Sequence, residues 1–100
     1  MRIKLTTSSE LKPGHMTCVE INQQRILLAN VEGTLYAVAA LCTHEDWPLC
    51  NGALKGDSVE CPLHGSRFNL KTGMPLDAPA TQPLQTYPLT RIDNEFYLDI

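Results

Sequence analysis

Three features are missing from this chain of 100 residues, and each absence argues against a class of protein. No apolar run is long enough to cross a bilayer, and the N-terminus lacks the basic and apolar segments of a signal peptide. Basic residues are not in excess: the formal net charge is −3, which argues against a nucleic-acid binder. We therefore expect a cytoplasmic protein with neither a membrane nor a nucleic acid as its partner.

The chain also has few of the residues that catalytic sites need. It contains no G-x-G-x-x-G fingerprint for a dinucleotide, so we do not expect it to oxidise NAD(P)H by itself. Histidine occurs at three positions only, His15, His44 and His64. A chain of this length forms one small domain with a marginal core, so a bound metal that ties two loops together would contribute to its folding.

Cysteine and histidine are concentrated in two short motifs. The first motif is Cys42-Thr43-His44, and the second is Cys61-Pro62-Leu63-His64, followed by Gly65. Together they place two thiolates and two imidazoles within reach of one metal site. A tetrahedral zinc site accepts these ligand types, but zinc fingers usually pair Cys with Cys and His with His, as C-x2-4-C and H-x3-5-H. Mixed pairs suit an asymmetric dinuclear cluster, although a zinc-stabilised interaction module stays an alternative.

The pattern C-x-H-x16-C-x2-H resembles that of the Rieske family, in which two cysteines hold one iron of a [2Fe–2S] cluster and two histidines hold the other. Flanking residues also match the family's pattern, namely Pro48-Leu49, Gly52, Gly65, Phe68 and Thr72-Gly73. The resemblance implies that Cys42, His44, Cys61 and His64 are the ligands of one Rieske [2Fe–2S] cluster. With neutral imidazoles the oxidised cluster carries no net charge, which raises its reduction potential relative to a cluster with four cysteines.

The resemblance further implies a role for residues around the cluster. High-potential Rieske proteins carry an extra disulfide between the two motifs, but the matching positions here are Trp47 and Leu63. They also have a hydroxyl donor, which this chain keeps as Ser66, and a tyrosine, which is replaced here by Phe68. We expect a potential in the lower half of the range of about −150 to +300 mV, raised somewhat by Ser66.

A proline-containing segment covers the cluster in Rieske proteins, and its counterpart here is Ala78-Pro79-Ala80. A plain linker back to the rest of the domain is the alternative for this segment. The resemblance also places the two histidines near the surface where electrons leave, so partners are expected to dock near His44 and His64. Glu45 and Asp46 follow the first histidine directly and are candidate docking residues.

The whole pattern looks like a Rieske-type ferredoxin of a multicomponent aromatic-ring dioxygenase system. Such a ferredoxin passes single electrons from an NAD(P)H-dependent flavoprotein reductase to the terminal oxygenase. Once two histidines bind the cluster, only His15 remains, so the chain cannot also hold the mononuclear iron of an oxygenase. We predict an electron carrier without a substrate site of its own, not an enzyme, and expect a monomer. The small Rieske-like subunit of an assimilatory nitrite reductase is a further alternative.

The rest of the sequence predicts an all-β fold. Alternating residues bounded by turn residues indicate short strands at 2–5, 16–21, 25–29, 35–40, 59–61, 67–70, 84–92 and 96–100. No stretch has a convincing helical period. With the resemblance, this predicts a Rieske fold: an antiparallel sandwich or barrel base, formed by 1–40 and 74–100, with a small cluster-binding subdomain inserted at 41–73.

Two cysteines, Cys18 and Cys50, are left over from the proposed ligand set. Because we expect a reducing compartment, we predict that they are free thiols and not a disulfide.

Overall fold

A computed structural model describes residues 2–5, 11–43, 48–62, 65–78, 82–93 and 95–99. Its strands are β1 (Arg2–Leu5), β2 (Met16–Ile21), β3 (Gln24–Val31), β4 (Thr34–Ala39), β5 (Ala53–Lys55), β6 (Ser58–Glu60), β7 (Arg67–Asn69), β8 (Thr86–Tyr87), β9 (Leu89–Ile92) and β10 (Glu95–Asp99). One 3-10 turn, η2 (Leu49–Asn51), lies between β4 and β5. All strand pairs among the described residues are antiparallel, which confirms the predicted all-β class.

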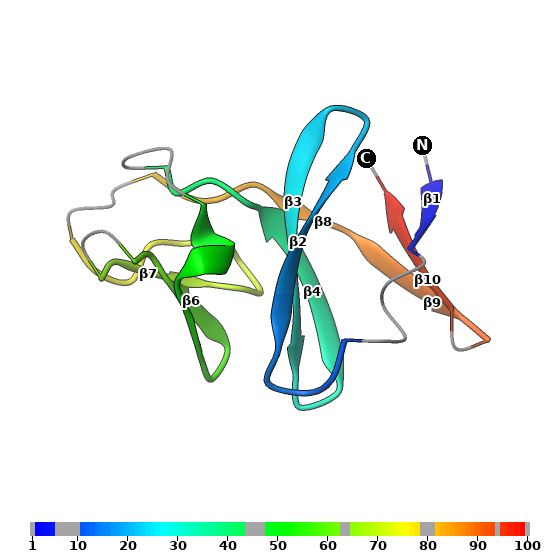
Figure 1. Cartoon of the computed structure of the whole chain (residues 1–100), viewed down its shortest axis with the longest axis horizontal. Coiled ribbons are helices and arrows are strands. Elements are labelled where there is room, and N and C mark those ends of the chain that lie inside the picture. Colours follow the sequence, from blue (N-terminus) through cyan, green and yellow to red (C-terminus); the bar gives the residue numbers. More distant parts are fainter. Residues whose placement is uncertain are drawn as a thin grey trace.

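The strands form three sheets. A central sheet has the order β2-β3-β4-β8, a terminal sheet has the order β1-β10-β9, and a small sheet has the order β5-β6-β7. Figure 1 shows the central sheet between the other two, with the small sheet on one side and the terminal sheet, with both chain ends, on the other. No helix in the described part of the chain is long and apolar enough to span a membrane.

Strand β3 is buried on both faces, which explains its uninterrupted apolar run from Ile26 to Ala29. Because side chains alternate along a strand, Leu27 and Ala29 point to one face and Ile26 and Leu28 to the other. The first pair joins a core that includes residues of the small sheet, and the second pair joins a core with Leu98 of the terminal sheet. The central sheet is therefore the shared wall of two hydrophobic cores.

The core on the side of the small sheet is the one that concerns function. It combines Val59 of β6 and Phe68 of β7 with Leu49 of η2, and all three side chains are fully buried. The same core contains Cys42 and Cys61, the two predicted cysteine ligands. Close packing of these apolar side chains fixes the positions of the segments that carry the two motifs.

The C-terminal region differs from the sequence prediction. The single strand expected at 84–92 is wrong, because β8 pairs with β4 of the central sheet while β9 pairs with β10 of the terminal sheet. Pro88 lies between them and has no N–H to continue a ladder, so the chain changes sheets there. The hairpin of β9 and β10 is confirmed, whereas β5 and η2 were not predicted from the sequence.

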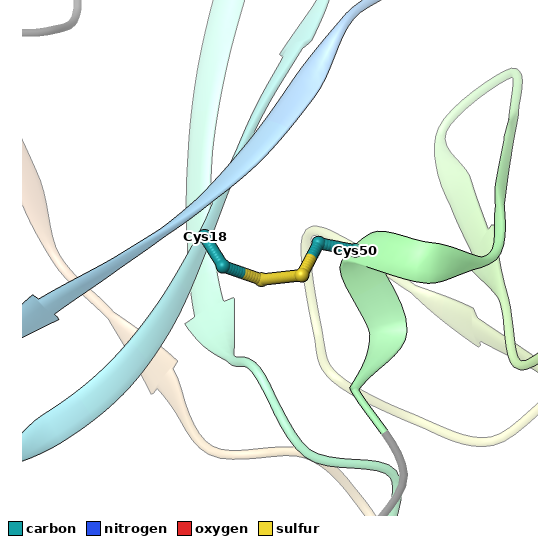
Figure 2. The surroundings of a disulfide bond; sticks show 2 residues. All are labelled: Cys18 and Cys50. Carbon is teal, nitrogen blue, oxygen red and sulfur yellow. A yellow bond between two sulfur atoms is a disulfide. The ribbon is translucent and has the colours of Figure 1, made fainter.

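The two cysteines outside the motifs are joined by a disulfide, Cys18–Cys50 (Figure 2). The prediction that they are free thiols is therefore wrong. Cys18 lies on the same face of β2 as Met16, and both residues pack against the core that contains η2. Their Cα atoms are 5.9 Å apart although 32 positions separate them in the sequence. The packing of the central sheet against η2 creates this proximity, which no local pattern predicts.

Candidate metal centre

The predicted cysteine ligands leave the ends of two different strands. Cys42 follows β4 and Cys61 follows β6 directly, and each side chain is only 1% exposed. Both keep their thiol groups, because the disulfide uses the other two cysteines. The other predicted site residues, His44, His64 and Pro79, lie outside the described residues, as do Glu45 and Asp46.

Backbone hydrogen bonds close the base of the first motif. Leu41 and Pro48 form an isolated antiparallel bridge, and the N–H of Leu49 donates to the carbonyl of Ala40 at 2.8 Å. These contacts hold residues 48–49, after the first motif, beside residues 40–41, before it. Cys42 is thereby placed at the buried base of a closed loop, and His44 lies further along the same loop in the sequence.

The second motif is closed in a similar way. The N–H of Cys61 donates to the carbonyl of Ser66 at 2.8 Å, and the N–H of Gly65 donates to the carbonyl of Cys61 at 3.0 Å. Gly65 has a φ of 75°, a backbone conformation that glycine adopts without the steric cost of a side chain. The closed loop joins β6 to β7, so the small sheet holds both of its ends.

The segment that contains Pro79 is held at both of its described ends. At its start, Arg67 of β7 forms a two-pronged ion pair with Asp77, with a distance of 2.6 Å between Nε and Oδ2. At its end, the hydroxyl of Thr43 donates to the carbonyl of Gln82 at 2.8 Å. One tether therefore joins the segment to the strand after the second motif, and the other joins it to the middle residue of the first motif.

The Arg67–Asp77 pair also shifts the pKa values of its two side chains. The hydrogen bond from Arg67 lowers the pKa of the Asp77 carboxyl below its ordinary value, and the same bond raises the pKa of the Arg67 guanidinium. The backbone N–H of Arg67 donates to the same carboxylate at 3.2 Å. Both side chains are largely solvated, so the pair serves mainly to position the segment.

Ser66 is the one buried polar side chain of the described residues that lacks a hydrogen-bond partner among them. Its side chain is 1% exposed, and its hydroxyl has no hydrogen-bond partner among them. The other buried serine, Ser58, donates its hydroxyl to the carbonyl of Lys55 at 2.8 Å. A buried hydroxyl without a partner costs about 1–3 kcal/mol, so Ser66 needs an acceptor.

The residues present therefore fit an iron–sulfur cluster. Two buried thiols lie in one apolar core, and the buried hydroxyl of Ser66, two residues after the second motif, has a hydrogen to donate. Cluster sulfur supplies acceptors of this kind, and thiolates are its usual ligands. The sequence predicted both cysteines and Ser66 as site residues, and all three are buried in the structure. It did not predict the tethers of Thr43 to Gln82 and of Asp77 to Arg67, which span 39 and 10 positions.

Comparison with known proteins identifies the family. The model of the Rieske [2Fe-2S] domain matches residues 1–88. The ferredoxin component of biphenyl 2,3-dioxygenase from Rhodococcus jostii (strain RHA1) is 36% identical over 97 residues, which are 97% of this chain and 91% of that protein. The ferredoxin component of the naphthalene 1,2-dioxygenase system from Pseudomonas putida is 39% identical over 92 residues, covering 92% of this chain and 88% of that protein.

A solved structure is also similar to this chain over nearly its whole length. A chain in the complex of reduced oxygenase and oxidized ferredoxin in carbazole 1,9a-dioxygenase superposes with a TM-score of 0.89 at 34% sequence identity. The superposition covers 97% of this chain and 91% of that chain. The family match includes both Cys–His motifs, and the relatives agree with the chain over nearly their whole lengths. The chain belongs to the Rieske [2Fe–2S] domain family.

Proposed function

We propose that this protein is the ferredoxin of a multicomponent aromatic-ring dioxygenase system. It carries single electrons from an NAD(P)H-dependent flavoprotein reductase to the terminal oxygenase and has no substrate site of its own. The observation that supports this most strongly is the near full-length similarity to proteins named as ferredoxin components of such systems. That similarity favours the ferredoxin over the nitrite reductase subunit, and the family match favours an iron–sulfur cluster over zinc.

In this proposal Cys42 and Cys61 hold one iron, and His44 and His64 hold the other. When bound, a Rieske cluster accepts and releases one electron at a time. The chain's own residues supply a fixed, apolar environment: the core around Cys42 and Cys61 excludes water, and the closed loops limit movement of the ligands. Ser66 donates its hydrogen bond toward the cluster, and the tethered segment with Pro79 covers it.

The arrangement of partners follows from the position of the histidines in the proposal. The reductase and the oxygenase both dock near His44 and His64, and the protein works as a monomer in the cytoplasm. We also propose the division of the chain into a base, 1–40 and 74–100, and a cluster-binding subdomain, 41–73. The small sheet supports this division, because none of its described strands joins either of the other two sheets, although Phe68 of β7 also forms an isolated bridge with Pro75 just beyond the subdomain.

The test begins with protein purified without oxidants. It should be red-brown, contain iron and inorganic sulfide in equal amounts, and show an EPR signal only after reduction. A colourless protein with one zinc per chain would overturn the proposal at the level of the metal. Mixed with a flavoprotein reductase and an aromatic-ring oxygenase, the protein should support NAD(P)H-dependent hydroxylation. Support of nitrite reduction instead would assign it to the alternative system.

A further inference from the structure

The Cys18–Cys50 disulfide joins a strand of the central sheet to the turn that follows the first motif. Cys18 lies in the middle of β2, and Cys50 lies in η2, as Figure 2 shows. The Rieske resemblance does not account for this bond, because its extra disulfide falls at Trp47 and Leu63. The two cysteines therefore need a role of their own.

The turn η2 is directly coupled to the loop of the first motif. Leu49, the neighbour of Cys50, is fully buried in the core with Cys42 and Cys61, and its N–H bonds to Ala40 just before the motif. Pro48 forms the bridge to Leu41 that closes the loop. A covalent tie at Cys50 thus holds in place the segment that closes the loop of the first motif.

The disulfide is also within reach of solvent. Both cysteines are partly buried and line a cavity of about 240 Å³, together with Glu20, Arg25, Leu41 and Pro48. A small thiol can approach the sulfur atoms through this cavity. Cys42 and Cys61, in contrast, are almost completely enclosed. A thiol reagent therefore reaches the disulfide pair before it reaches the predicted ligands.

We propose that Cys18 and Cys50 form a thiol–disulfide redox site that controls how firmly the protein holds its metal centre. As a disulfide the pair ties η2 to β2 and keeps the loop of the first motif closed. As a dithiol it releases η2, the contacts of Pro48 and Leu49 with residues 40–41 break more often, and the cluster is lost faster. The effect on the cluster rests on the proposed function, whereas the effect on the loop does not.

The reaction needs a dithiol as its reductant. One thiolate of the reductant attacks a sulfur of the disulfide, forms a mixed disulfide and releases the other cysteine as a thiolate, which takes up a proton. The second thiol of the reductant then displaces the remaining cysteine and leaves as a cyclic or protein disulfide. Two electrons and two protons pass to Cys18 and Cys50 in total. In a reducing compartment such a pair responds to the state of the thiol pool, because disulfides there are usually transient.

The test compares the cluster-loaded wild-type protein, with and without a dithiol such as dithiothreitol, under anaerobic conditions. After alkylation, the intact mass should show two more modified thiols in the reduced sample. With an iron chelator present, the visible absorbance should decay about tenfold faster after reduction, because a constraint on a 32-residue separation is lost. Equal decay rates, or alkylation of the pair without any reductant, would overturn the proposal.

A double variant, Cys18→Ser with Cys50→Ser, is the matched control for effects of the reductant on the cluster itself. It should lose its cluster at the fast rate, with or without dithiothreitol. If the variant responds to the reductant as strongly as the wild-type protein does, the pair is not the site of action. Should the variant fail to fold, wild-type protein that has been reduced, alkylated and freed of dithiothreitol replaces it, and this sample should lose its cluster at the fast rate; decay at the slow rate would overturn the proposal.

Hydrogen exchange gives a readout that does not depend on the cluster. Reduction should increase exchange in a peptide spanning 41–50, while a peptide spanning 89–99 in the terminal sheet should be unchanged. Uniform loss of protection in both peptides would show general destabilisation and contradict the proposal. If the protein holds zinc, the proposed function fails, but the exchange pattern still tests the tie between η2 and β2.

Discussion

At the scale of single residues, burial separates the four cysteines into two pairs with different chemistry. Cys42 and Cys61 are enclosed in the apolar core beside Phe68, where a metal can be held away from water. Cys18 and Cys50 are bonded to each other at the edge of that core, next to an open cavity. Substitution of one pair or the other should therefore have different effects.

Changing either predicted ligand, Cys42→Ser or Cys61→Ser, should abolish the cluster. Without the cluster, the loops of the two motifs are no longer joined through bound iron, so the variants should also unfold at a lower temperature. Iron content and visible absorbance per chain measure the first effect, and thermal unfolding measures the second. The single variants Cys18→Ser and Cys50→Ser serve as controls and should still assemble a cluster. A colourless Cys50→Ser protein beside a coloured Cys42→Ser protein would show that the ligand assignment is wrong.

The buried hydroxyl of Ser66 allows a second prediction at this scale. Ser66→Ala should lower the reduction potential by tens of millivolts without loss of the cluster, because a hydrogen bond that stabilises the added electron is removed. A shift of about 60 mV corresponds to about 1.4 kcal/mol for one electron, which is near the contribution of one hydrogen bond to a charged group. Voltammetry of the purified protein measures the shift.

Ser58→Ala is the matched control for Ser66→Ala. Ser58 is equally enclosed, but its hydroxyl already bonds to the carbonyl of Lys55. Its removal should change stability and leave the potential where it was. In cluster-free protein, Ser66→Ala should not destabilise the fold, since it removes a hydroxyl that has no partner in the described part of the chain. Equal potentials of the Ser66→Ala and wild-type proteins would mean that the hydroxyl donates elsewhere.

At the scale of elements, the segment containing Pro79 depends on its two tethers. Hydrogen bonds from β7 hold its start, and Thr43 of the first motif holds its end. The described residues on either side of Pro79 are mostly exposed, and exposed segments are the first to open locally. The Arg67–Asp77 pair should therefore affect the metal centre more than its solvent exposure suggests.

Asp77→Asn should speed release of the cluster and have little effect on global unfolding. Glu95→Gln, which breaks the similar exposed pair with Lys4 at 3.0 Å in the terminal sheet, is the control and should leave release unchanged. The rate of cluster release in excess chelator is measured for both variants, and thermal unfolding measures their global stability. If the two variants lose the cluster equally fast, the tether has no specific role.

Acid should weaken the same tether in the wild-type protein. Arg67 lowers the pKa of Asp77 below its ordinary value of 3.8. A group whose pKa is lowered by folding stabilises the native state above its ordinary pKa, and this contribution is lost as the pH falls through the lowered value. The difference in the rate of cluster release between wild-type protein and Asp77→Asn should therefore be constant near neutral pH. It should disappear only below about pH 4, where Asp77 becomes protonated.

At the scale of the whole molecule, the three sheets are arranged along the longest axis. The chain measures 40 × 27 × 20 Å, and Figure 1 shows the small sheet toward one end and both termini toward the other. Partners that dock at the end with the small sheet do not need to contact the terminal sheet. Charge changes at the two ends should therefore have separate effects on electron transfer.

Reversing both acidic residues after the first histidine, Glu45→Lys with Asp46→Lys, should slow electron delivery to the oxygenase at low salt. The loss should shrink as ionic strength rises, because the screening length is about 10 Å at 0.1 M. The association rate should fall while the spectrum and potential stay the same, since charges at the rim of an interface mainly steer encounter. Turnover with reductase and oxygenase, measured across a salt series, provides the test.

A second double variant, Glu95→Lys with Asp99→Lys, gives the control for this prediction. It changes the net charge by the same amount, but both residues lie on β10 in the terminal sheet. Turnover of this variant should follow the wild-type protein at every salt concentration. A defect of equal size in both variants would indicate an effect of net charge, and a defect that salt does not relieve would indicate damaged folding.

The sequence by itself predicted the kind of metal centre, which the family match supports, and the positions of most strands. The spacing of the two motifs identifies the cluster, the alternation in β2 places Cys18 on the side of Met16, and turn residues mark the ends of several strands. These features depend on residues that are close together in the chain. Their physical causes, strand periodicity and backbone preferences at turns, act over a few residues.

Only the tertiary structure decided which distant segments meet. It pairs Cys18 with Cys50, joins Asp77 to Arg67, and sends the chain from one sheet to another at Pro88. The disulfide and the change of sheet follow from how the other elements pack on the two faces of the central sheet, whereas the Asp77–Arg67 pair follows from the antiparallel contact between β7 and the segment around Pro75. Packing depends on the shape and volume of side chains from the whole chain at once, so no local pattern in the sequence contains it.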